Sequence, residues 1–386
     1  MSDRLRVMIS CGEPSGDLYA GALASEILKI EPGAIISGFG GERLRAAGAS
    51  LVRDFRGVSV TGLTEALRVI PRSWQNYRAL VRAADDERPD VFVPIDFPDF
   101  NFFLARALHA RGIPIVYYIS PQLWAWRRGR LKTMKRVADR VLVIFPFEQA
   151  FYEAAGVPAT FVGHPLLEMT APDADRGTFL RREGLDPARP VVAMLPGSRR
   201  NELRTILPDL VKTAGLIAAR VPSSQFLVAR APHLDDELFA SLSAWPAQAA
   251  KPVIVEGATD AVLASADVAV LASGTVTVQA ALHGCPMVVV YRVGPLTYRL
   301  GKPLVHVDTY AMANLVAGRR VVPELIQDDF TPDAAAAEAL RVLTDPVYAA
   351  RMKADLADVR ARLGTPGASG RAAEAIIEVA RSSRRP

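Results

Sequence analysis

Residues 5–17 read LRVMISCGEPSGD, an apolar run followed at once by a loop of small and polar residues. The run has the length of a buried strand, and residues 18–30, after the loop, have the composition of a helix. A strand that meets a helix through such a loop is typical of the ligand-binding edge of an open α/β sheet, where backbone N–H groups face the ligand. This segment therefore predicts both a fold class and a binding site.

The same pattern recurs along the chain, as short β-branched runs alternating with segments of helical composition. The runs are continuously apolar, which indicates parallel strands covered by helices on both faces. They lie at residues 5–11, 34–39, 91–95, 113–119, 141–145, 160–162, 191–195, 226–229, 253–255, 268–272 and 287–291. We expect an α/β protein with two Rossmann-like domains that each contain a parallel sheet.

The polar segment 172–177 is the best candidate linker between these domains. It places one domain in residues 1–171 and a second domain in residues 172–345. Residues 346–386 are rich in Ala, Glu and Arg, and we expect helices there that pack back on the first domain.

The composition is that of an ordinary globular protein. Of the 386 residues, 50% are apolar and 23% are charged, which argues against disorder and against a small disulfide-stapled scaffold. Cys11 and Cys285 are too few for a cysteine-based zinc site and fit a reducing compartment, and the N-terminus lacks a signal-peptide pattern, so we expect a cytoplasmic protein. The net charge of +5 favours an anionic partner.

Two carboxylates and an amide follow the run at 91–95, in the segment 96–101, DFPDFN. At the carboxyl edge of a sheet, one of the two carboxylates, Asp96 or Asp99, is suited to be a general base that accepts a proton from a substrate hydroxyl. Glu13 and apolar neighbours would raise its pKa. The structural alternative is that Asp99 caps the next helix and Asn101 ties the loop, just as Asp17 could cap the helix after the first strand.

Aromatic and basic residues follow one another in the segment 120–130, SPQLWAWRRGR. Such a mixture suits stacked nucleic-acid bases or a membrane interface with anionic headgroups. We favour an anionic membrane surface and expect no nucleic-acid partner, because the basic residues form one cluster and no RNA-binding module signature is present. The alternative is a solvated basic helix beside tryptophans that simply pack.

In the second half, two strand runs lead into loops that open helices, at residues 196–202 and 272–275. The Arg199 fork and backbone donors of the Gly and Ser residues suit a pyrophosphate, and two such loops in one domain favour a nucleotide diphosphate. Each loop alone would also serve as a helix cap. Phosphate-loop and dinucleotide fingerprints are absent, the histidine spacing does not indicate a metal site, and the D-x-D at 173–175 follows no strand, so we expect neither a cofactor nor a metal.

Together these segments resemble the lipid-A-disaccharide synthases, glycosyltransferases of the two-domain GT-B fold. The resemblance covers nearly the whole chain and is carried by residues 12–17, 95–101, 120–127, 145–148, 163–165, 195–199 and 272–275. It implies transfer of 2,3-diacylglucosamine from its UDP derivative to 2,3-diacylglucosamine 1-phosphate. The transfer would proceed with inversion and without a metal, giving a β-1,6-linked disaccharide 1-phosphate and UDP.

The resemblance also implies that residues 1–171 form the acceptor-side or membrane-side domain and that residues 172–345 form the UDP-sugar-binding domain. It further implies roles for individual residues. Asp99 is the expected base, with Glu13 as its rival. The expected contacts to UDP are Ser198, Arg199, Gly274, Thr275, Gln279 and Asn314. The expected acceptor or membrane contacts are Ser15, Asp17, Trp124, Trp126, Arg127 and Arg128.

Two positions depart from the family pattern. Gln279 stands where the family has a Glu that would accept ribose hydroxyls, and Asn314 follows Met-Ala rather than Leu-Pro. The alternatives are a UDP-sugar 2-epimerase of similar architecture and a non-catalytic binder of anionic lipid. We expect an enzyme that is peripheral on the inner membrane, with a homo-oligomer left open.

Overall fold

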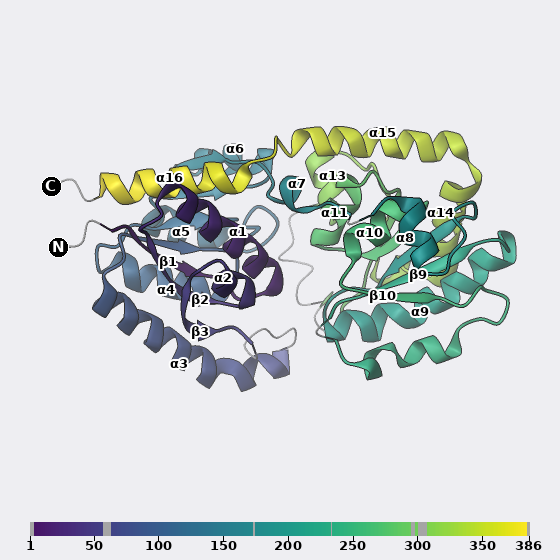
Figure 1. Ribbon diagram of the computed structural model, residues 1–386, viewed down its shortest axis with the longest axis horizontal. Coiled ribbons are helices and arrows are strands. Elements are labelled where there is room, and N and C mark those ends of the chain that lie inside the picture. Colours follow the sequence, from purple (N-terminus) through teal and green to yellow (C-terminus); the bar gives the residue numbers. More distant parts are fainter. Residues whose placement is uncertain are drawn as a thin grey trace. The chain divides into compact units, whose positions relative to one another are not determined.

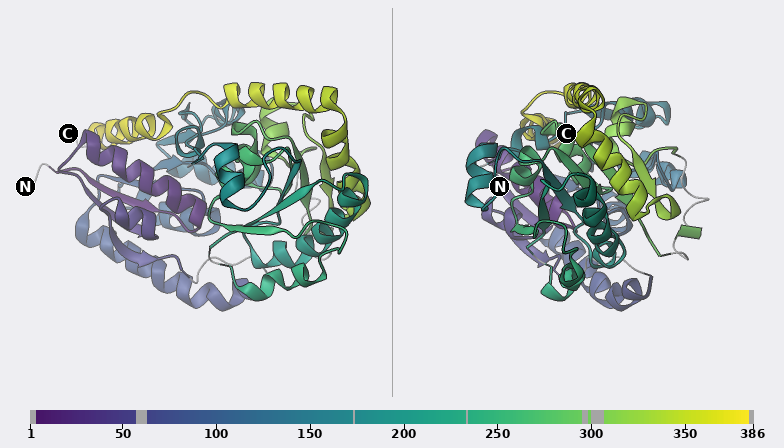
Figure 2. Two further views of the ribbon diagram at one scale, coloured as in Figure 1. Left: turned by 45° about the vertical axis from the view of Figure 1, so that its right-hand side comes forward. Right: turned by 90° about the vertical axis from the view of Figure 1, so that its right-hand side faces the viewer.

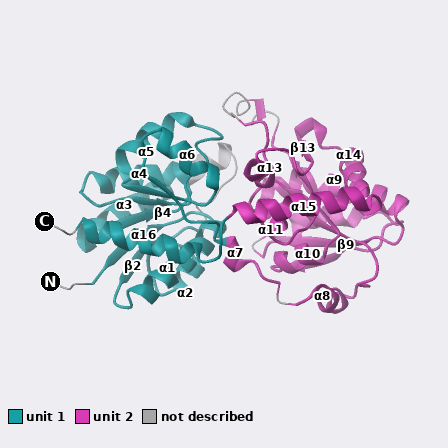
Figure 3. Ribbon diagram, turned by 90° about the horizontal axis from the view of Figure 1, so that it is seen from above, with its two compact units in different colours: residues 1–165, 364–386 teal, residues 166–363 magenta. Residues whose placement is uncertain are grey.

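The computed structural model describes residues 4–56, 63–172, 174–232, 234–294, 298–299 and 307–383 (Figures 1 and 2). The chain forms two compact units (Figure 3): unit 1 comprises residues 1–165 and 364–386, and unit 2 comprises residues 166–363. The first boundary therefore lies after Pro165, shortly before the polar segment that we expected to be the linker.

Unit 1 is built on parallel strands. Four of them, in the order β3-β2-β1-β4, form one sheet, and β5-β6-β7 form a second. The strands are β1 (Arg6–Ser10), β2 (Ile35–Gly40), β3 (Ser50–Asp54), β4 (Val91–Pro94), β5 (Val116–Tyr118), β6 (Arg140–Val143) and β7 (Ala159–Phe161). Isolated bridges from Phe92 to Ile115 and from Ile95 to Tyr118 join β4 to β5. The strand order therefore reverses between β1 and β4.

Helices cover both faces of these strands. They are α1 (Pro14–Ile30), α2 (Glu42–Ala46), α3 (Leu63–Glu87), α4 (Pro98–His109), α5 (Leu131–Val137), α6 (Pro146–Ala154) and α16 (Ala368–Ser382), with a 3-10 turn η1 (Arg128–Arg130). All four residues of β4 are buried, as the continuous apolar run predicts. Met8, Phe39 and Phe92 of the strands pack with Leu104 of α4 in the main core of the unit.

Unit 2 contains one parallel sheet of six strands in the order β10-β9-β8-β11-β12-β13. The strands are β8 (Val191–Leu195), β9 (Gln225–Arg230), β10 (Val253–Glu256), β11 (Val268–Ala272), β12 (Met287–Tyr291) and β13 (Glu324–Ile326). Its helices include α7 (Leu166–Met169), α8 (Arg176–Arg182), α9 (Arg200–Arg220), α10 (Thr259–Ser265), α11 (Thr275–Leu282), α13 (Met312–Ala317), α14 (Pro332–Thr344) and α15 (Pro346–Arg362), with 3-10 segments η2 (Asp236–Ala244) and η4 (Gln327–Asp329). Here the order reverses between β8 and β11.

Two α/β domains with parallel sheets were predicted, and that prediction is confirmed. The C-terminal segment, however, is divided between the units. Helix α15 stays with unit 2, where Met352 and Leu356 are buried on the side that packs against α11, α13 and α14. Only α16 packs on α1 in unit 1, where the Arg371 guanidinium also donates to the Val162 carbonyl at 2.8 Å. Burial of these two apolar faces in different cores explains the split.

Candidate active site

The carboxyl edge of unit 1 brings together the loops after β1 and β4, because Ser10 and Pro94 are paired in adjacent strands. A single buried amide ties these loops to each other. The Asn101 Nδ2 donates to the carbonyls of Ser10 and Ile95, both at 3.2 Å, and its Oδ1 accepts from the Ser10 hydroxyl at 2.6 Å. Asn101 thus holds in place the edge at which open α/β sheets bind ligands.

The turn after β4 is strained. Asp96 and Phe97 both have left-handed backbone angles, with φ of 41° and 47°, and each such residue costs roughly 1–3 kcal/mol. Tyr117 compensates by donating its hydroxyl to the Asp96 carbonyl at 2.9 Å. The Phe97 ring lies so close to Gly12 that a Cβ there would collide with it. The loops after β1 and β4 are therefore in contact, at a place where Gly is required.

Asp99 lies in the first turn of α4 with 65% of its side chain exposed. The Arg127 guanidinium donates to Asp99 Oδ1 at 2.7 Å, and the Arg130 guanidinium donates to the same oxygen. Partial burial would raise the pKa of Asp99, but the hydrogen bonds and charges of the two arginines outweigh it and lower the pKa. The raised pKa that we expected for a carboxylate here is therefore wrong for Asp99. The segment 96–101 could not show this, because both arginines lie outside it.

The other acidic residues of this edge differ in their surroundings. Glu13 is half-buried at the N-cap of α1, in the loop after β1, and Ser15 is half-buried in the first turn. The Asp17 carboxylate accepts from the backbone amides of Gly41, Arg43 and Leu44, at 2.7, 2.9 and 3.2 Å. Asp17 thus holds the start of α2, a cap on a different helix from the one that the sequence suggested.

Trp124 is buried, with 6% of its surface exposed. Its indole Nε1 donates to Glu148 Oε1 at 3.0 Å, and its ring packs edge-on against Phe147. A side chain buried in this way does not face a membrane, which argues against the membrane part of the acceptor or membrane contact that we expected for Trp124. Trp126 is half-buried beneath the Arg127 guanidinium, 4.4 Å from its ring centre, and Arg128 is exposed.

Sequence reasoning missed Glu148, which is 1% exposed. Its second oxygen accepts from the Phe145 amide at 3.2 Å, forming a cap at the start of α6. Burial raises the pKa of Glu148 to about 7, against the opposing effect of the Trp124 hydrogen bond. His164, packed beside the Phe145 ring, has its pKa lowered to about 3 by burial and is therefore neutral at pH 7.

The carboxyl edge of unit 2 repeats the arrangement of unit 1. Strands β8 and β11 are adjacent, with Leu195 paired to Leu271, so the loops that follow them leave the sheet side by side at its point of order reversal. Those loops carry residues 196–199 and 273–275. The structure therefore brings the two expected diphosphate loops to one edge.

Glu202, in the first turn of α9, already caps that helix by binding the first of these loops. Its Oε2 accepts from the amides of Ser198 and Arg199 at 3.0 and 3.2 Å, and its Oε1 accepts from the Arg199 guanidinium at 3.2 Å. Gly197, with φ of 118°, has no room for a Cβ beside Glu202. A phosphate at this loop would therefore be contacted by the side chains of Ser198 and Arg199 rather than by those amides.

The second loop is more open. Gly274 is the N-cap of α11, and both Gly274 and Thr275 are exposed. A Cβ built on Gly274 would meet nothing within 4 Å. Gln279, half-buried farther along the same helix, contacts Asp260. The start of α11 is thus accessible to an anion that the helix dipole would favour.

Asn314 is buried, and its amide is fully engaged. The Nδ2 donates to the Val322 carbonyl at 3.0 Å and to Glu324 Oε1 at 2.7 Å. The Oδ1 accepts from the amides of Val321 and Val322 at 2.7 and 2.9 Å. An amide has two donor hydrogens and one acceptor oxygen, so these bonds leave Asn314 bracing its own loop rather than contacting a nucleotide.

The remaining features of the sequence have local roles. Asp175 of the D-x-D segment caps α8 by accepting from the Thr178 amide at 3.0 Å, while Asp173 lies outside the described residues. Within the described ranges, no three His, Cys, Asp or Glu side chains are grouped so as to hold a metal ion. Across the same part of the chain, none of the helices is both long and apolar enough to cross a bilayer.

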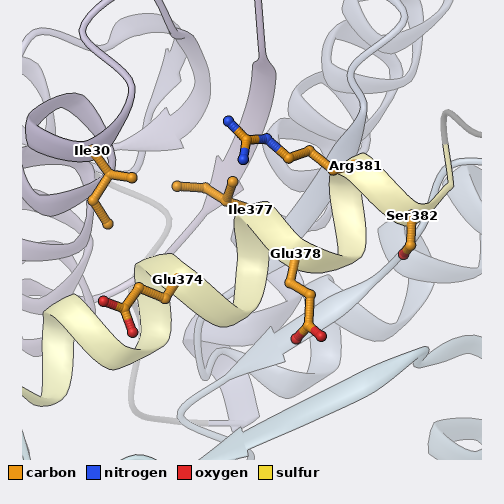
Figure 4. A pocket seen from close by; sticks show the side chains of 6 residues that line it. All are labelled: Ile30, Glu374, Ile377, Glu378, Arg381 and Ser382. Carbon is orange, nitrogen blue, oxygen red and sulfur yellow. The ribbon is translucent and has the colours of Figure 1, made fainter.

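The hollow shown in Figure 4 lies between α1 and α16, lined by Ile30, Glu374, Ile377, Glu378, Arg381 and Ser382, with a volume of about 460 Å³. Helix α1 begins at the carboxyl edge and Ile30 is its last residue, so this hollow lies at the opposite end of that helix. It is therefore separate from the loops described above.

Comparison with known proteins gives a consistent result at the level of sequence. The family model described as "Lipid-A-disaccharide synthetase" matches residues 7–376. A protein named lipid-A-disaccharide synthase from Koribacter versatilis is 46% identical over 384 residues, covering 97% of this chain and 99% of its own. The protein of that name from Geobacter sulfurreducens is 44% identical over 377 residues, covering 97% of each chain.

Solved structures share the fold. The glycosyltransferase of kitacinnamycin aligns with a TM-score of 0.64 at 20% identity, covering 98% of this chain and 100% of that one. UDP-GlcNAc 2-epimerase from Neisseria meningitidis bound to UDP-GlcNAc aligns with a TM-score of 0.64 at 12% identity, with the same coverage. At these identities the likeness concerns the fold alone, which is the GT-B-like architecture of two Rossmann-like domains.

The buried Glu148 carboxyl predicts a specific pH dependence of stability. Its pKa of about 7 in the folded chain exceeds the ordinary 4.5, so its ionisation costs folding free energy that grows as the pH rises from about 4.5 to 7. Relative to Glu148→Gln, the wild type should therefore lose up to about 3 kcal/mol of unfolding free energy between pH 5 and pH 8. Urea denaturation at both pH values measures this difference.

The control is Glu42→Gln, which removes a carboxylate with 74% of its side chain exposed. This variant should follow the pH dependence of the wild type. Equal pH slopes for the wild type and Glu148→Gln would show that Glu148 titrates normally.

Proposed function

The chain belongs to the lipid-A-disaccharide synthase family, and we propose that its two units divide that reaction between them. Its activity is lipid-A-disaccharide synthase activity, a glycosyl transfer in lipid A biosynthesis. In the proposal, unit 2 binds UDP-2,3-diacylglucosamine and unit 1 presents 2,3-diacylglucosamine 1-phosphate. The observation that carries the proposal is the reversal of strand order in each unit. Basic and hydroxyl side chains lie at the reversal in unit 2, and carboxylates lie at the reversal in unit 1.

On the donor side, the diphosphate is held by the Arg199 guanidinium, the Ser198 hydroxyl and the start of α11 at Gly274 and Thr275. The 43% exposure of the Arg199 side chain supports this assignment, as does the space beside Gly274. These groups are positive where UDP leaves with its negative charge, so they stabilise the transition state more than the bound donor. Gln279 contacts the ribose.

On the acceptor side, Asp99 accepts the proton of the attacking sugar hydroxyl. The hydroxyl oxygen forms a bond to the anomeric carbon from the face opposite UDP, the bond from that carbon to UDP breaks, and the configuration inverts. Glu13, on the neighbouring loop, is the alternative base. No metal takes part in this scheme, in which the arginine and helix charges neutralise the leaving group.

The arginines paired to Asp99 have a second task in this proposal. Arg127 and Arg130 have 39% and 27% of their side chains exposed, and guanidinium groups bind phosphate as well as carboxylate. The acceptor's 1-phosphate draws them away from Asp99. Because these arginines lower the pKa of Asp99, their transfer to phosphate makes the carboxylate a stronger base at the moment when the acceptor is bound.

Product analysis tests the proposed reaction. Incubation with both acylated substrates should release UDP and form a disaccharide 1-phosphate, while neither substrate alone should release UDP. A donor that is isomerised without any acceptor would instead indicate a UDP-sugar 2-epimerase. Lipid binding without turnover would indicate a non-catalytic binder.

Replacing the proposed base should abolish most of the rate. Asp99→Asn should lower kcat by about 10²–10⁴-fold, the usual effect of losing a general base, and should leave UDP affinity unchanged because Asp99 belongs to unit 1. Steady-state kinetics and calorimetry measure the two quantities. Glu13→Gln is the matched variant: if it alone loses the rate, the base is Glu13 and the assignment of Asp99 fails.

We also propose that unit 1 contacts the membrane, through residues other than the buried Trp124. Ile70 and Trp74 lie one turn apart on α3 and are 57% and 58% exposed, with Arg72 and Arg78 exposed on the same helix. Phe103, 65% exposed, lies on α4, which packs against α3. Apolar side chains with neighbouring arginines fit the interface of an anionic leaflet, where the acylated substrates reside.

The α3 surface predicts how the chain binds vesicles. Trp74→Ser should weaken binding to phosphatidylglycerol-containing vesicles about 10–100-fold, because burying a large apolar side chain contributes about 1.5–3 kcal/mol. Vesicle sedimentation measures the change. Val347→Ser, which alters a 77% exposed residue of unit 2, is the control and should bind like the wild type. If Trp74→Ser and Val347→Ser bind vesicles equally well, α3 does not form the membrane-binding surface.

A further inference from the structure

Three polar side chains of unit 2 form a cluster along the second half of α11. Asp260 Oδ1 accepts from Gln279 Nε2 at 3.3 Å and lies 2.9 Å from His283 Nε2. Asp260 comes from α10, whereas Gln279 and His283 come from α11 and its C-cap. The Asp260 side chain keeps 26% of its surface exposed, while that of His283 keeps only 7%. The cluster therefore has a buried support and an accessible carboxylate.

The carboxylate fixes the direction of the Gln279 amide. A carboxylate can only accept hydrogen bonds, so the amide must turn its NH₂ group toward Asp260 and its carbonyl oxygen away. For the same reason, the His283 Nε2 that faces Asp260 carries a hydrogen. Both contacts fall on Oδ1, so within the described part of the chain Oδ2 and the Gln279 carbonyl oxygen remain as two acceptors of one cluster.

The cluster lies at a suitable distance from the proposed diphosphate loop. Gln279 follows Thr275 by four residues on the same helix, which is a rise of about 6 Å along its axis. A nucleoside diphosphate with its phosphates at the start of α11 carries its ribose one sugar ring away, so the ribose hydroxyls fall at about this depth. The cluster thus offers two acceptor atoms on hydrogen-bonded residues, one for each of the two vicinal hydroxyl donors of a ribose.

We propose that Asp260 is a positioning residue for the donor nucleotide, which orients Gln279 so that its carbonyl oxygen accepts one ribose hydroxyl while Asp260 Oδ2 accepts the other. This inference rests on the proposed function of unit 2 as the UDP site. It accounts for a neutral amide at position 279: the single negative charge of the ribose site is carried by residue 260. A carboxylate at position 279 could not donate the hydrogen bond that Gln279 gives to Asp260, and its negative charge would repel that of Asp260.

A residue swap tests this arrangement in the full-length chain. Calorimetric titrations with UDP and with 2′,3′-dideoxy-UDP would be compared for Gln279→Glu, Asp260→Asn, Asp260→Ala and the double variant Asp260→Asn with Gln279→Glu. Asp260→Ala should weaken UDP about 10–100-fold, the usual range for a lost charged hydrogen bond, and should change the affinity of the dideoxy compound by less than about threefold.

Gln279→Glu alone should weaken the binding of UDP about tenfold, because it places two negatively charged carboxylates next to each other. The double variant should bind UDP within about threefold of the wild type, since the new amide at position 260 would donate to the new carboxylate at position 279 and the net charge is restored. Asp236→Ala, which alters a carboxylate with 90% of its side chain exposed, is the matched control and should bind both nucleotides normally. Thermal unfolding verifies that each variant is folded.

Each remaining outcome contradicts a distinct step. If Asp260→Ala weakens UDP and dideoxy-UDP equally, Asp260 only supports the fold and the inference is overturned. The inference also fails if the double variant shows no recovery relative to Gln279→Glu. If the wild type binds UDP but Arg199→Ala binds it equally well, the proposed diphosphate site fails instead. A wild type that does not bind UDP would overturn the donor site and this inference with it.

Discussion

The reversal of strand order is the constraint on which the molecule depends. In a parallel sheet, helices that follow neighbouring strands normally cover the same face, but across β1/β4 and β8/β11 they run to opposite faces and leave a crevice at the carboxyl edge. Loops far apart in the sequence meet there without any covalent link. Each unit has one such edge, and the acidic and basic groups of the proposed reaction stand at these two edges.

Many of the polar side chains near these edges hold the loops in position through hydrogen bonds. Asn101 ties two strand ends together, Asp17 holds the start of α2, and Glu202 occupies the amides that open α9. Because buried backbone groups must be paired, a loop that leaves the sheet abruptly needs such side chains. The groups to which we assign the reaction, such as Asp99 and Arg199, are a few side chains at the fixed loops.

The sequence predicted most of the strands and the loops that leave them, because continuous apolar runs and small-residue loops are local signals. It did not predict which groups meet across the fold. The pKa of Asp99 is lowered by Arg127 and Arg130, which lie 28 and 31 residues away in the chain. Trp124 likewise meets Glu148 from 24 residues away, although a Glu three residues after the N-cap Phe145 is the half of a capping pattern that points to that glutamate.

The central claim is that the β8/β11 edge receives the donor's diphosphate and that Asp99 of the β1/β4 edge receives the acceptor's proton. A crystal structure with UDP and the acceptor monosaccharide phosphate tests it most directly. The account predicts a diphosphate in contact with Arg199 and the start of α11, and the attacking hydroxyl within hydrogen-bond distance of Asp99. UDP bound away from α11, or an acceptor whose hydroxyl contacts neither Asp99 nor Glu13, would contradict it.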